Sequence, residues 1–169
     1  GMPEGFAYRE DLLTRAEEAD LVRRFESLPF KPFEFHGYLG KRRIVSFGWR
    51  YDYSKRGINP GAAIPDWLVP LRDRAAAFAK VPAEALEHAL VTEYAAGAGI
   101  GWHRDKAEFG DVIALSFLAP CKLRFRRERD DGKWERQAQL VALRSGYLLR
   151  GAARNVWQHS IPPLDALRD

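Results

Sequence analysis

Apolar residues recur at helical spacing in the first third of the chain. They stand at i, i+1, i+4 and i+7 on one face: Leu21, Val22, Phe25 and Leu28. Thr14 and Glu17 have the spacing of a capping box, which predicts a helix that begins just after Thr14 and ends before Pro29. A similar pattern predicts a second helix over residues 66–78, and Pro82 fits the first turn of a short third helix.

The hydrophobic period changes near position 88, where strands replace helices. Residues 122–127 alternate charged and apolar side chains at period two, as a strand with one buried face does. The other strand candidates are short and separated by turn residues: 89–94, 112–118, 135–143, 147–150 and 156–161. Helices followed by short strands predict an α+β chain, in which an antiparallel sandwich or barrel is backed by helices.

The composition is that of one globular domain. Of 169 residues, 46% are hydrophobic and 30% are charged, so the chain can bury a core and is too apolar for a disordered segment. No apolar run approaches the ~18 residues of a membrane span, and the N-terminus has no signal pattern. The single cysteine, Cys121, forbids an internal disulfide and fits a reducing compartment. We therefore expect a cytoplasmic protein, monomeric and without a membrane partner; its net charge of +4 permits nucleic acid as a partner without requiring it.

Two histidines and one carboxylate form the candidate reactive set. His103 and Asp105 stand two positions apart after the glycine-rich loop 97–101, and His159 lies in a late strand candidate. Residues two apart in a strand project to one face, and strands distant in sequence converge inside a barrel. Two imidazoles and one carboxylate are the ligands of the facial triad that holds Fe(II) and leaves other positions open. The sequence therefore predicts an iron site.

A plainer interpretation of the same residues stays open. The chain has 23 acidic residues, so an acid two positions after one of its four histidines is expected by chance in about half of such chains. In that interpretation His103 is a solvated loop histidine, and His159 is a strand histidine satisfied by a neighbour. The glycine loop and the late strand favour the metal site over this alternative.

An ordered series of motifs carries a resemblance to a known family. The series is Tyr94-Ala95-Ala96-Gly97, His103-Arg104-Asp105, and then residues 113–117, 123–126, 145–149 and 157–162. In this order it resembles the AlkB family of Fe(II)/2-oxoglutarate-dependent dioxygenases over roughly residues 30–168. The resemblance implies a double-stranded β-helix, or jelly roll, with N-terminal helices packed outside. It also implies a single domain over residues 1–169, with helices and a substrate lid at about 6–90 and the jelly-roll core at about 89–169.

The resemblance implies a role for particular residues. His103, Asp105 and His159 match the iron ligands, and Tyr94 matches a tyrosine that hydrogen-bonds the cosubstrate. Arg168 matches the first of two family arginines, and its planar guanidinium would bind the distal carboxylate of 2-oxoglutarate. The cofactors implied are Fe(II), 2-oxoglutarate as cosubstrate, and O2.

The sequence departs from the family pattern at three places. It stops at Asp169, before the second arginine and the last strand of the pattern. Thr92 stands where repair members of the family often have asparagine. Ala107 stands where they tend to carry an acid near the alkylated base. These differences leave the metal chemistry intact and bear on the substrate.

The aromatic and basic segment 35–53 lies where the family has its substrate lid. Six residues in it are candidate substrate contacts: Tyr38, Lys41, Arg42, Arg43, Trp49 and Tyr51. The rings would stack on a base opposite His103, and the cations would contact phosphates. Two alternatives stay open, because aromatic residues at period two also mark a core face and a basic run is often a solvated one.

A second basic surface is predicted on a hairpin around residues 130–132, with the same alternative. Its residues are Arg124, Arg126, Arg127, Arg129 and Arg136.

Three functions fit the sequence. The leading one is repair-type demethylation, the oxidative dealkylation of N-alkylated bases in DNA or RNA, with the base in single-stranded or flipped form. The second is the same chemistry on a protein side chain or a small molecule. The third is a non-catalytic jelly-roll binding module, which the intact ligand set disfavours because such a module has no need of an open iron face.

Overall fold

The computed structural model of the chain describes residues 1–35, 38–52, 57–60, 62–95, 97–105 and 110–163, with side chains described outside 32–41 and 49–60. Its helices are α1 (Arg15–Glu26), η1 (Asp66–Leu68), α2 (Val69–Ala79), η2 (Ala83–Ala85) and α3 (Gly151–Asn155). The first five strands are β1 (Phe6–Arg9), β2 (Lys31–Phe35), β3 (Tyr38–Asp52), β4 (Gly57–Pro60) and β5 (His88–Tyr94). The others are β6 (Ile100–His103), β7 (Val112–Leu115), β8 (Cys121–Glu128), β9 (Trp134–Val141), β10 (Gly146–Leu149) and β11 (Gln158–Ile161).

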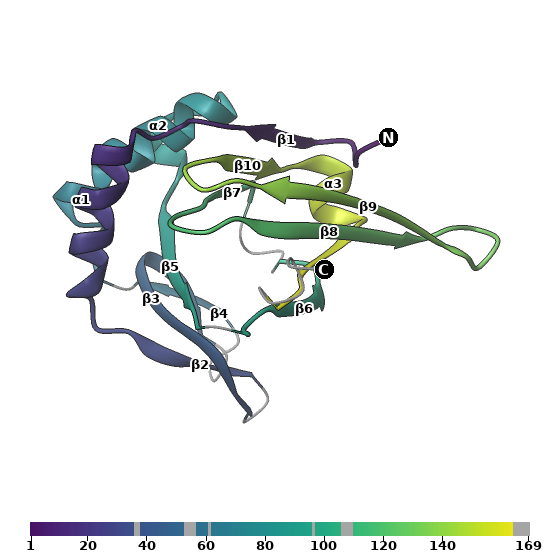
Figure 1. Cartoon of the computed structure of the whole chain (residues 1–169), viewed down its shortest axis with the longest axis horizontal. Coiled ribbons are helices and arrows are strands. Elements are labelled where there is room, and N and C mark those ends of the chain that lie inside the picture. Colours follow the sequence, from purple (N-terminus) through teal and green to yellow (C-terminus); the bar gives the residue numbers. More distant parts are fainter. Residues whose placement is uncertain (36–37, 53–56, 61, 96, 106–109, 164–169) are drawn as a thin grey trace.

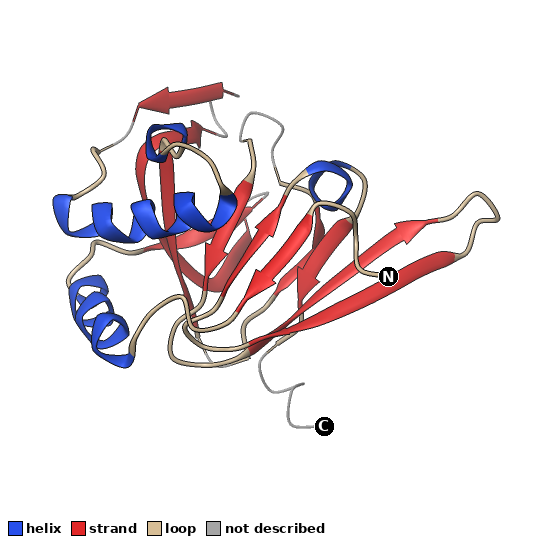
Figure 2. Ribbon diagram, turned by 90° about the horizontal axis from the view of Figure 1, so that it is seen from above, coloured by secondary structure: helices blue, strands red, loops and turns tan. Residues whose placement is uncertain are grey.

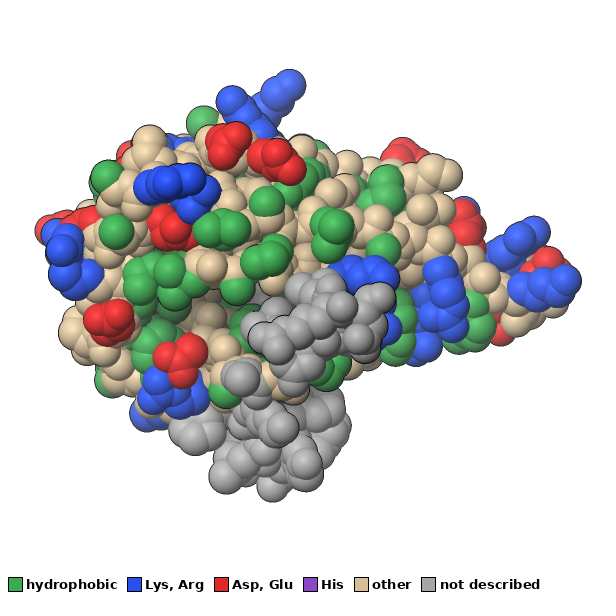
Figure 3. Space-filling view, in the orientation of Figure 1, with side chains coloured by type: hydrophobic (Ala, Val, Ile, Leu, Met, Phe, Trp, Pro, Cys, Tyr) green, Lys and Arg blue, Asp and Glu red, His purple; other side chains and the backbone are tan. Residues whose placement is uncertain are grey.

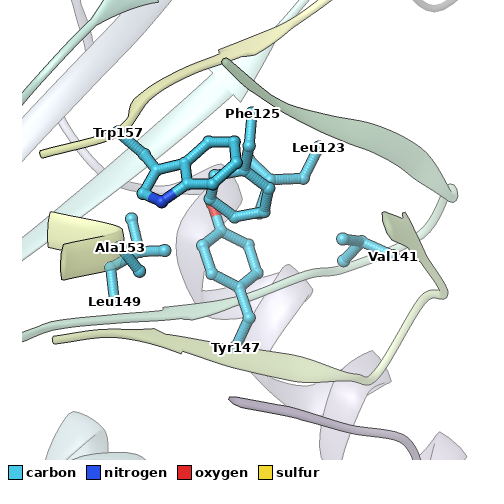
Figure 4. Packing of buried hydrophobic residues seen from close by; sticks show 7 residues of the cluster. All are labelled: Leu123, Phe125, Val141, Tyr147, Leu149, Ala153 and Trp157. Atoms are coloured by element: carbon cyan, nitrogen blue, oxygen red, sulfur yellow. The ribbon is translucent and has the colours of Figure 1, made fainter. Parts of the chain in front are cut away.

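Two antiparallel sheets enclose the main core (Figure 1). One has the strand order β1-β10-β7 and the other β6-β11-β8-β9. Side chains of β8, β9 and β10 meet between them with residues of the α3 segment (Figure 4): Leu123, Phe125, Val141, Tyr147, Leu149, Ala153 and Trp157. Phe125 is fully buried, and its ring meets Phe6 edge-on with ring centroids 5.0 Å apart. This arrangement confirms the α+β class and the jelly roll.

A third sheet and the helices form a second layer at one side of the core (Figures 1 and 2). Its order is β2-β3-β4, and β5 pairs with β3 from Arg42 to Gly48. Helices α1, η1 and α2 pack on this sheet around a second cluster of buried residues: Leu13, Leu21, Phe47 and Leu68. The prediction that helices lie outside the jelly roll is confirmed, and Phe47 belongs to a core face, as one of the open alternatives held.

Local sequence signals predicted most of these elements. Helix α1 has the capping box, since the Glu17 amide donates to Thr14 Oγ1 (3.1 Å) and the Thr14 amide donates to Glu17 Oε1 (2.9 Å). The helix predicted over 66–78 starts as one turn of 3-10 helix and continues as α2. The strand predicted to reach Leu118 stops at Leu115, and Leu118 itself has a positive φ of 70° that no strand accommodates.

Several short elements were not predicted, among them β1 and α3. Strand β1 pairs with β10 and so completes a core sheet from the far N-terminus, although residues 6–90 were expected to hold helices and lid. Helix α3 lies between the strands predicted over 147–150 and 156–161, and β11 begins at Gln158 and not at Val156. No helix in the described ranges is long and apolar enough to cross a bilayer.

Candidate metal centre

The structure brings His103, Asp105 and His159 together. His103 ends β6, and His159 stands directly opposite it on β11, with the two ring centroids 4.3 Å apart. Asp105 follows two residues after β6, with Oδ1 3.7 Å from His103 Nε2 and Oδ2 3.5 Å from His159 Nε2. The three ligand atoms lie within 4.8 Å of one another, close enough to share one ion. The predicted convergence is therefore present in the fold.

The backbone of the glycine loop and of the first residues of β6 fixes the orientation of His103. The Nδ1 atom of His103 lies 2.7 Å from the Gly101 carbonyl oxygen, which only accepts, so Nδ1 carries the proton and Nε2 is left to bind a cation. Gly99 lets this loop lie against the end of β11, because a Cβ there would be 2.4 Å from the Ile161 carbonyl oxygen. Gly101 itself has open space around its Cβ position. Backbone contacts thus hold the imidazole toward the centre.

Burial and neighbouring groups set the charges of His159 and Asp105. His159 is only 7% exposed, and this burial, opposed by the Asp105 carboxylate, lowers its pKa to about 4, so its imidazole is neutral at physiological pH. Burial alone would raise the pKa of Asp105, but the adjacent imidazoles and Arg154 outweigh it and lower that pKa, so the carboxylate is ionised. A neutral imidazole and a carboxylate are the protonation states that bind metal.

One carboxylate oxygen at this centre is unsatisfied by protein. Asp105 Oδ2 is buried and has no hydrogen-bond partner among the described residues. A buried anionic oxygen without a partner costs free energy, and a cation between the imidazoles would remove that cost. The donor set, two imidazole nitrogens and one carboxylate, is the one that non-haem Fe(II) takes. These residues therefore fit an iron ion.

A buried arginine that the sequence analysis missed holds the segment after Asp105. Arg154 on α3 is 7% exposed, and its Nη1 donates to the Asp105 carbonyl oxygen (3.0 Å) while its Nε donates to the Gly110 carbonyl oxygen (3.1 Å). One guanidinium thereby ties together the two ends of the 105–110 segment. The only hint in the sequence was a charged residue after two alanines, which is too common a pattern to single out.

We expect Arg154→Lys to weaken metal binding by about 10- to 100-fold, the usual cost of disturbing a group that orients a ligand. Lysine keeps the positive charge but cannot reach both carbonyl oxygens, so the Asp105 backbone loses its tie. Titration of the metal-free protein with Mn(II) measures the affinity. Arg144→Lys is the matched control, because Arg144 pairs with Glu18 away from the centre. Equal Mn(II) affinity in the Arg154→Lys variant and the unmodified protein would contradict the clamp.

Tyr94 is a half-buried residue at the end of β5, within electrostatic range of Asp105. Burial, offset in part by the adjacent Arg42, raises the pKa of Tyr94, and the Asp105 carboxylate contributes in the same direction. Tyr147 is close by, and its pKa is raised by burial and by its neighbours Tyr94, Cys121 and Asp105. This placement suits the predicted cosubstrate contact of Tyr94. Arg168, the predicted partner of the distal carboxylate, lies outside the described residues.

Only two of the predicted substrate contacts have described side chains. The Arg42 guanidinium lies over the Tyr94 ring, 5.9 Å from its centroid. Arg43 pairs with Glu93, with Nη2 2.6 Å from Oε1, so a carboxylate already balances its charge. The side chains of Tyr38, Lys41, Trp49 and Tyr51 lie outside the described residues. A substrate role for these residues stays a prediction.

Comparison with known proteins decides the family. The model of the 2OG-Fe(II) oxygenase superfamily matches residues 5–167, nearly the whole chain. The chain belongs to this superfamily. Within it, the chain is 27% identical to the alkylated DNA repair protein ALKBH8 homolog of Arabidopsis thaliana, over 94% of the chain and 51% of that protein. The chain thus spans about half the length of this curated relative.

A solved structure gives the same assignment for the fold. The structure of OsALKBH1 superposes with a TM-score of 0.69 at 18% identity, covering 96% of this chain and 87% of the other. At this identity the likeness speaks for the jelly roll alone. The superfamily match confirms the predicted class of Fe(II)/2-oxoglutarate oxygenases, and the Arabidopsis relative agrees with the predicted resemblance to the AlkB family.

Proposed function

We propose that this protein is an Fe(II)/2-oxoglutarate-dependent dioxygenase that dealkylates N-alkylated bases in DNA or RNA. The observation that carries the proposal is the convergence of His103, Asp105 and His159 around a buried carboxylate oxygen that no described protein group satisfies. Membership of the oxygenase superfamily supports the reaction class. We further propose that it acts as a cytoplasmic monomer.

The residues of the centre would divide the work of binding. His103 and His159 would each offer an imidazole nitrogen, and Asp105 would add the one negative charge of the set. When bound, Fe(II) with 2-oxoglutarate and O2 supplies the oxidation, in which the cosubstrate becomes succinate and CO2 and an alkyl C–H bond gains a hydroxyl group. A hydroxylated N-methyl group then breaks down to formaldehyde and the unmethylated base.

The interior side chains would place the cosubstrate and exclude water. Tyr94 would donate its hydroxyl to 2-oxoglutarate, and Arg168 would pair with the distal carboxylate. The aromatic core next to the centre, which includes the fully buried Phe125 and nearly buried Trp157, leaves little room for water behind His159. A site closed on this side favours substrate oxidation over loss of the oxidant to solvent.

Support for nucleic acid as the substrate comes from the relative and from charge. The Arabidopsis relative is named as an alkylated DNA repair protein. The net charge of +4 and a sequence pI near 9.3 suit a polyanionic substrate. The predicted contacts of Arg42 and Arg43 with phosphates belong to this proposal.

The test is a turnover assay with several substrate classes. Protein supplied with Fe(II), 2-oxoglutarate and air is offered N-methylated single-stranded DNA, N-methylated RNA and methyl-lysine peptides, and succinate and formaldehyde are measured together. We expect formaldehyde from the oligonucleotides in step with succinate. Formaldehyde from the peptides alone would move the substrate to a protein side chain. No succinate from metal-loaded protein with any substrate would contradict the enzyme itself.

A further inference from the structure

A row of cations and tryptophans covers the outer face of the sheet β6-β11-β8-β9. Side chains alternate along these strands, so residues next to Phe125 and His159 point away from the core. The outward side chains of this face, here called the outer platform, are Trp102, Lys122, Arg124, Arg126, Trp134 and Arg136. Figure 3 shows Lys and Arg side chains interleaved with hydrophobic ones along the β8–β9 hairpin.

The guanidinium groups of the outer platform are held in place by the protein. The Arg126 guanidinium lies between two indoles, 4.5 Å from the Trp102 ring and 4.4 Å from the Trp134 ring. Arg124 lies 5.0 Å from the Trp102 ring, and Arg136 lies 6.0 Å from it. Cation–π contacts of this kind fix a cation without neutralising it. The row is therefore ordered and remains positive.

Hydrogen bonds to neutral groups add to this order. Arg124 Nε donates to Ser160 Oγ (3.0 Å), and Arg126 Nε donates to Gln158 Oε1 (2.9 Å). These partners are side chains of β11 and carry no charge. They leave the terminal nitrogens of both guanidinium groups available to an outside ligand.

The outer platform lacks compensating acids. None of its four cations forms an ion pair with a carboxylate in the part of the chain that the structure describes, whereas Arg127, on the opposite side of β8, pairs with Glu135 at 2.8 Å. The four positive charges of the outer platform are as many as the net charge of the entire chain, +4. An open hollow of about 410 Å³ lies over this face and is bordered by Trp102, Lys122, Arg124 and Arg136. An anionic ligand of nucleotide size fits these features.

We propose that the outer platform binds the sugar–phosphate backbone and bases of single-stranded nucleic acid that flanks the target base. This rests on the proposed function, in which nucleic acid is the substrate. Fixed cations suit phosphates, and exposed indole and guanidinium faces suit stacked bases. A purely acidic peptide has no bases to stack on these faces. Trp102 lies on the outer face and its neighbour His103 on the inner face of β6, so the edge of this sheet separates the platform from the reaction centre.

Charge reversal at the two exposed cations tests the phosphate contacts. Lys122 and Arg136 make no described hydrogen bond or ion pair, so Lys122→Glu with Arg136→Glu should leave the fold intact. Binding of unmodified fluorescent oligonucleotides is measured by anisotropy over a salt series. We expect affinity to fall by roughly tenfold or more and the salt slope to shrink by about 1.4, two contacts at about 0.7 each. Arg9→Glu with Arg15→Glu, two exposed cations elsewhere, is the matched control and should not reproduce the slope change.

A second comparison tests the stacking contacts. Trp134 is 44% exposed, so Trp134→Leu is tolerable to the fold. The variant should bind a base-containing oligonucleotide about five- to tenfold more weakly than the unmodified protein and bind an abasic one equally well. Equal losses on both oligonucleotides, or competition by polyglutamate as strong as by oligonucleotide of equal charge, would overturn nucleic acid as the occupant.

These outcomes separate the platform from the proposed function. Normal oligonucleotide binding by the double variant, with formaldehyde released from methylated oligonucleotides, would overturn the platform and leave the function standing. Weakened binding by the double variant, with no formaldehyde from any oligonucleotide, would support the platform and overturn the substrate. Absence of any oligonucleotide binding by the unmodified protein at low salt would overturn both.

Discussion

Asp105→Ala is expected to abolish turnover while leaving the metal-free protein folded. Metal sites in proteins hold their ion by about 10–16 kcal/mol, so removing one of three ligands should cost roughly 4 kcal/mol, or about 1,000-fold in affinity. The metal-free protein loses a buried carboxylate whose Oδ2 has no partner among the described residues, but which the adjacent imidazoles and Arg154 favour in its ionised form, so the two effects on stability oppose each other. Melting in EDTA and in excess Mn(II) measures both effects.

The expected pattern is a folded protein with a cooperative melting transition in EDTA, with loss of the rise in Tm that Mn(II) gives the original protein. Asp130→Ala is the control, because Asp130 is exposed in the β8–β9 turn. A variant that still gains stability from Mn(II) and releases succinate would show that Asp105 is not a ligand. A variant that unfolds in EDTA would show that the carboxylate has a structural role instead.

Phe125→Ala is expected to destabilise the fold by about 3–5 kcal/mol, the usual range for a buried phenylalanine. Its ring is completely buried and meets Phe6 and Trp157 edge-on. Alanine would leave a cavity between the two sheets of the jelly roll, directly beside the strand that carries His159. Urea unfolding of the metal-free protein measures the free energy of unfolding.

Leu140→Ala serves as the control on the same hairpin. Leu140 is 65% exposed on β9, so its truncation should change the free energy of unfolding by less than about 0.5 kcal/mol. A loss below about 1 kcal/mol for Phe125→Ala would mean that the two sheets do not pack on this ring as the structure has them.

Elements coded by neighbouring residues were predictable from the sequence. The capping box of α1 needs only Thr14 and Glu17, three positions apart, and the two faces of β8 follow from alternation alone. Strand β1 has only four residues, and it exists because β10 pairs with it. Helix α3 has five residues and no side-chain cap, so nothing local marks it. Such elements depend on tertiary pairing.

The candidate site likewise combines features that the sequence predicted with features that only the tertiary fold creates. The spacing of His103 and Asp105 predicted that both would reach one centre. The position of His159 opposite His103 depends on β6 pairing with β11, strands that are far apart in the sequence. Arg154 was missed because an arginine is ordinarily solvated, and only the fold shows it buried with its donors on two backbone carbonyls.

The glycine loop carries a consequence for anyone redesigning this chain. Gly99 and Gly101 look interchangeable in the sequence, yet they differ in mutational freedom. A methyl group at position 101 enters open space, whereas one at 99 meets the backbone of Ile161 and Pro163. A library built around the centre can therefore diversify position 101. Position 99 admits only glycine, because any side chain there would push β6 away from β11 and separate the two histidines.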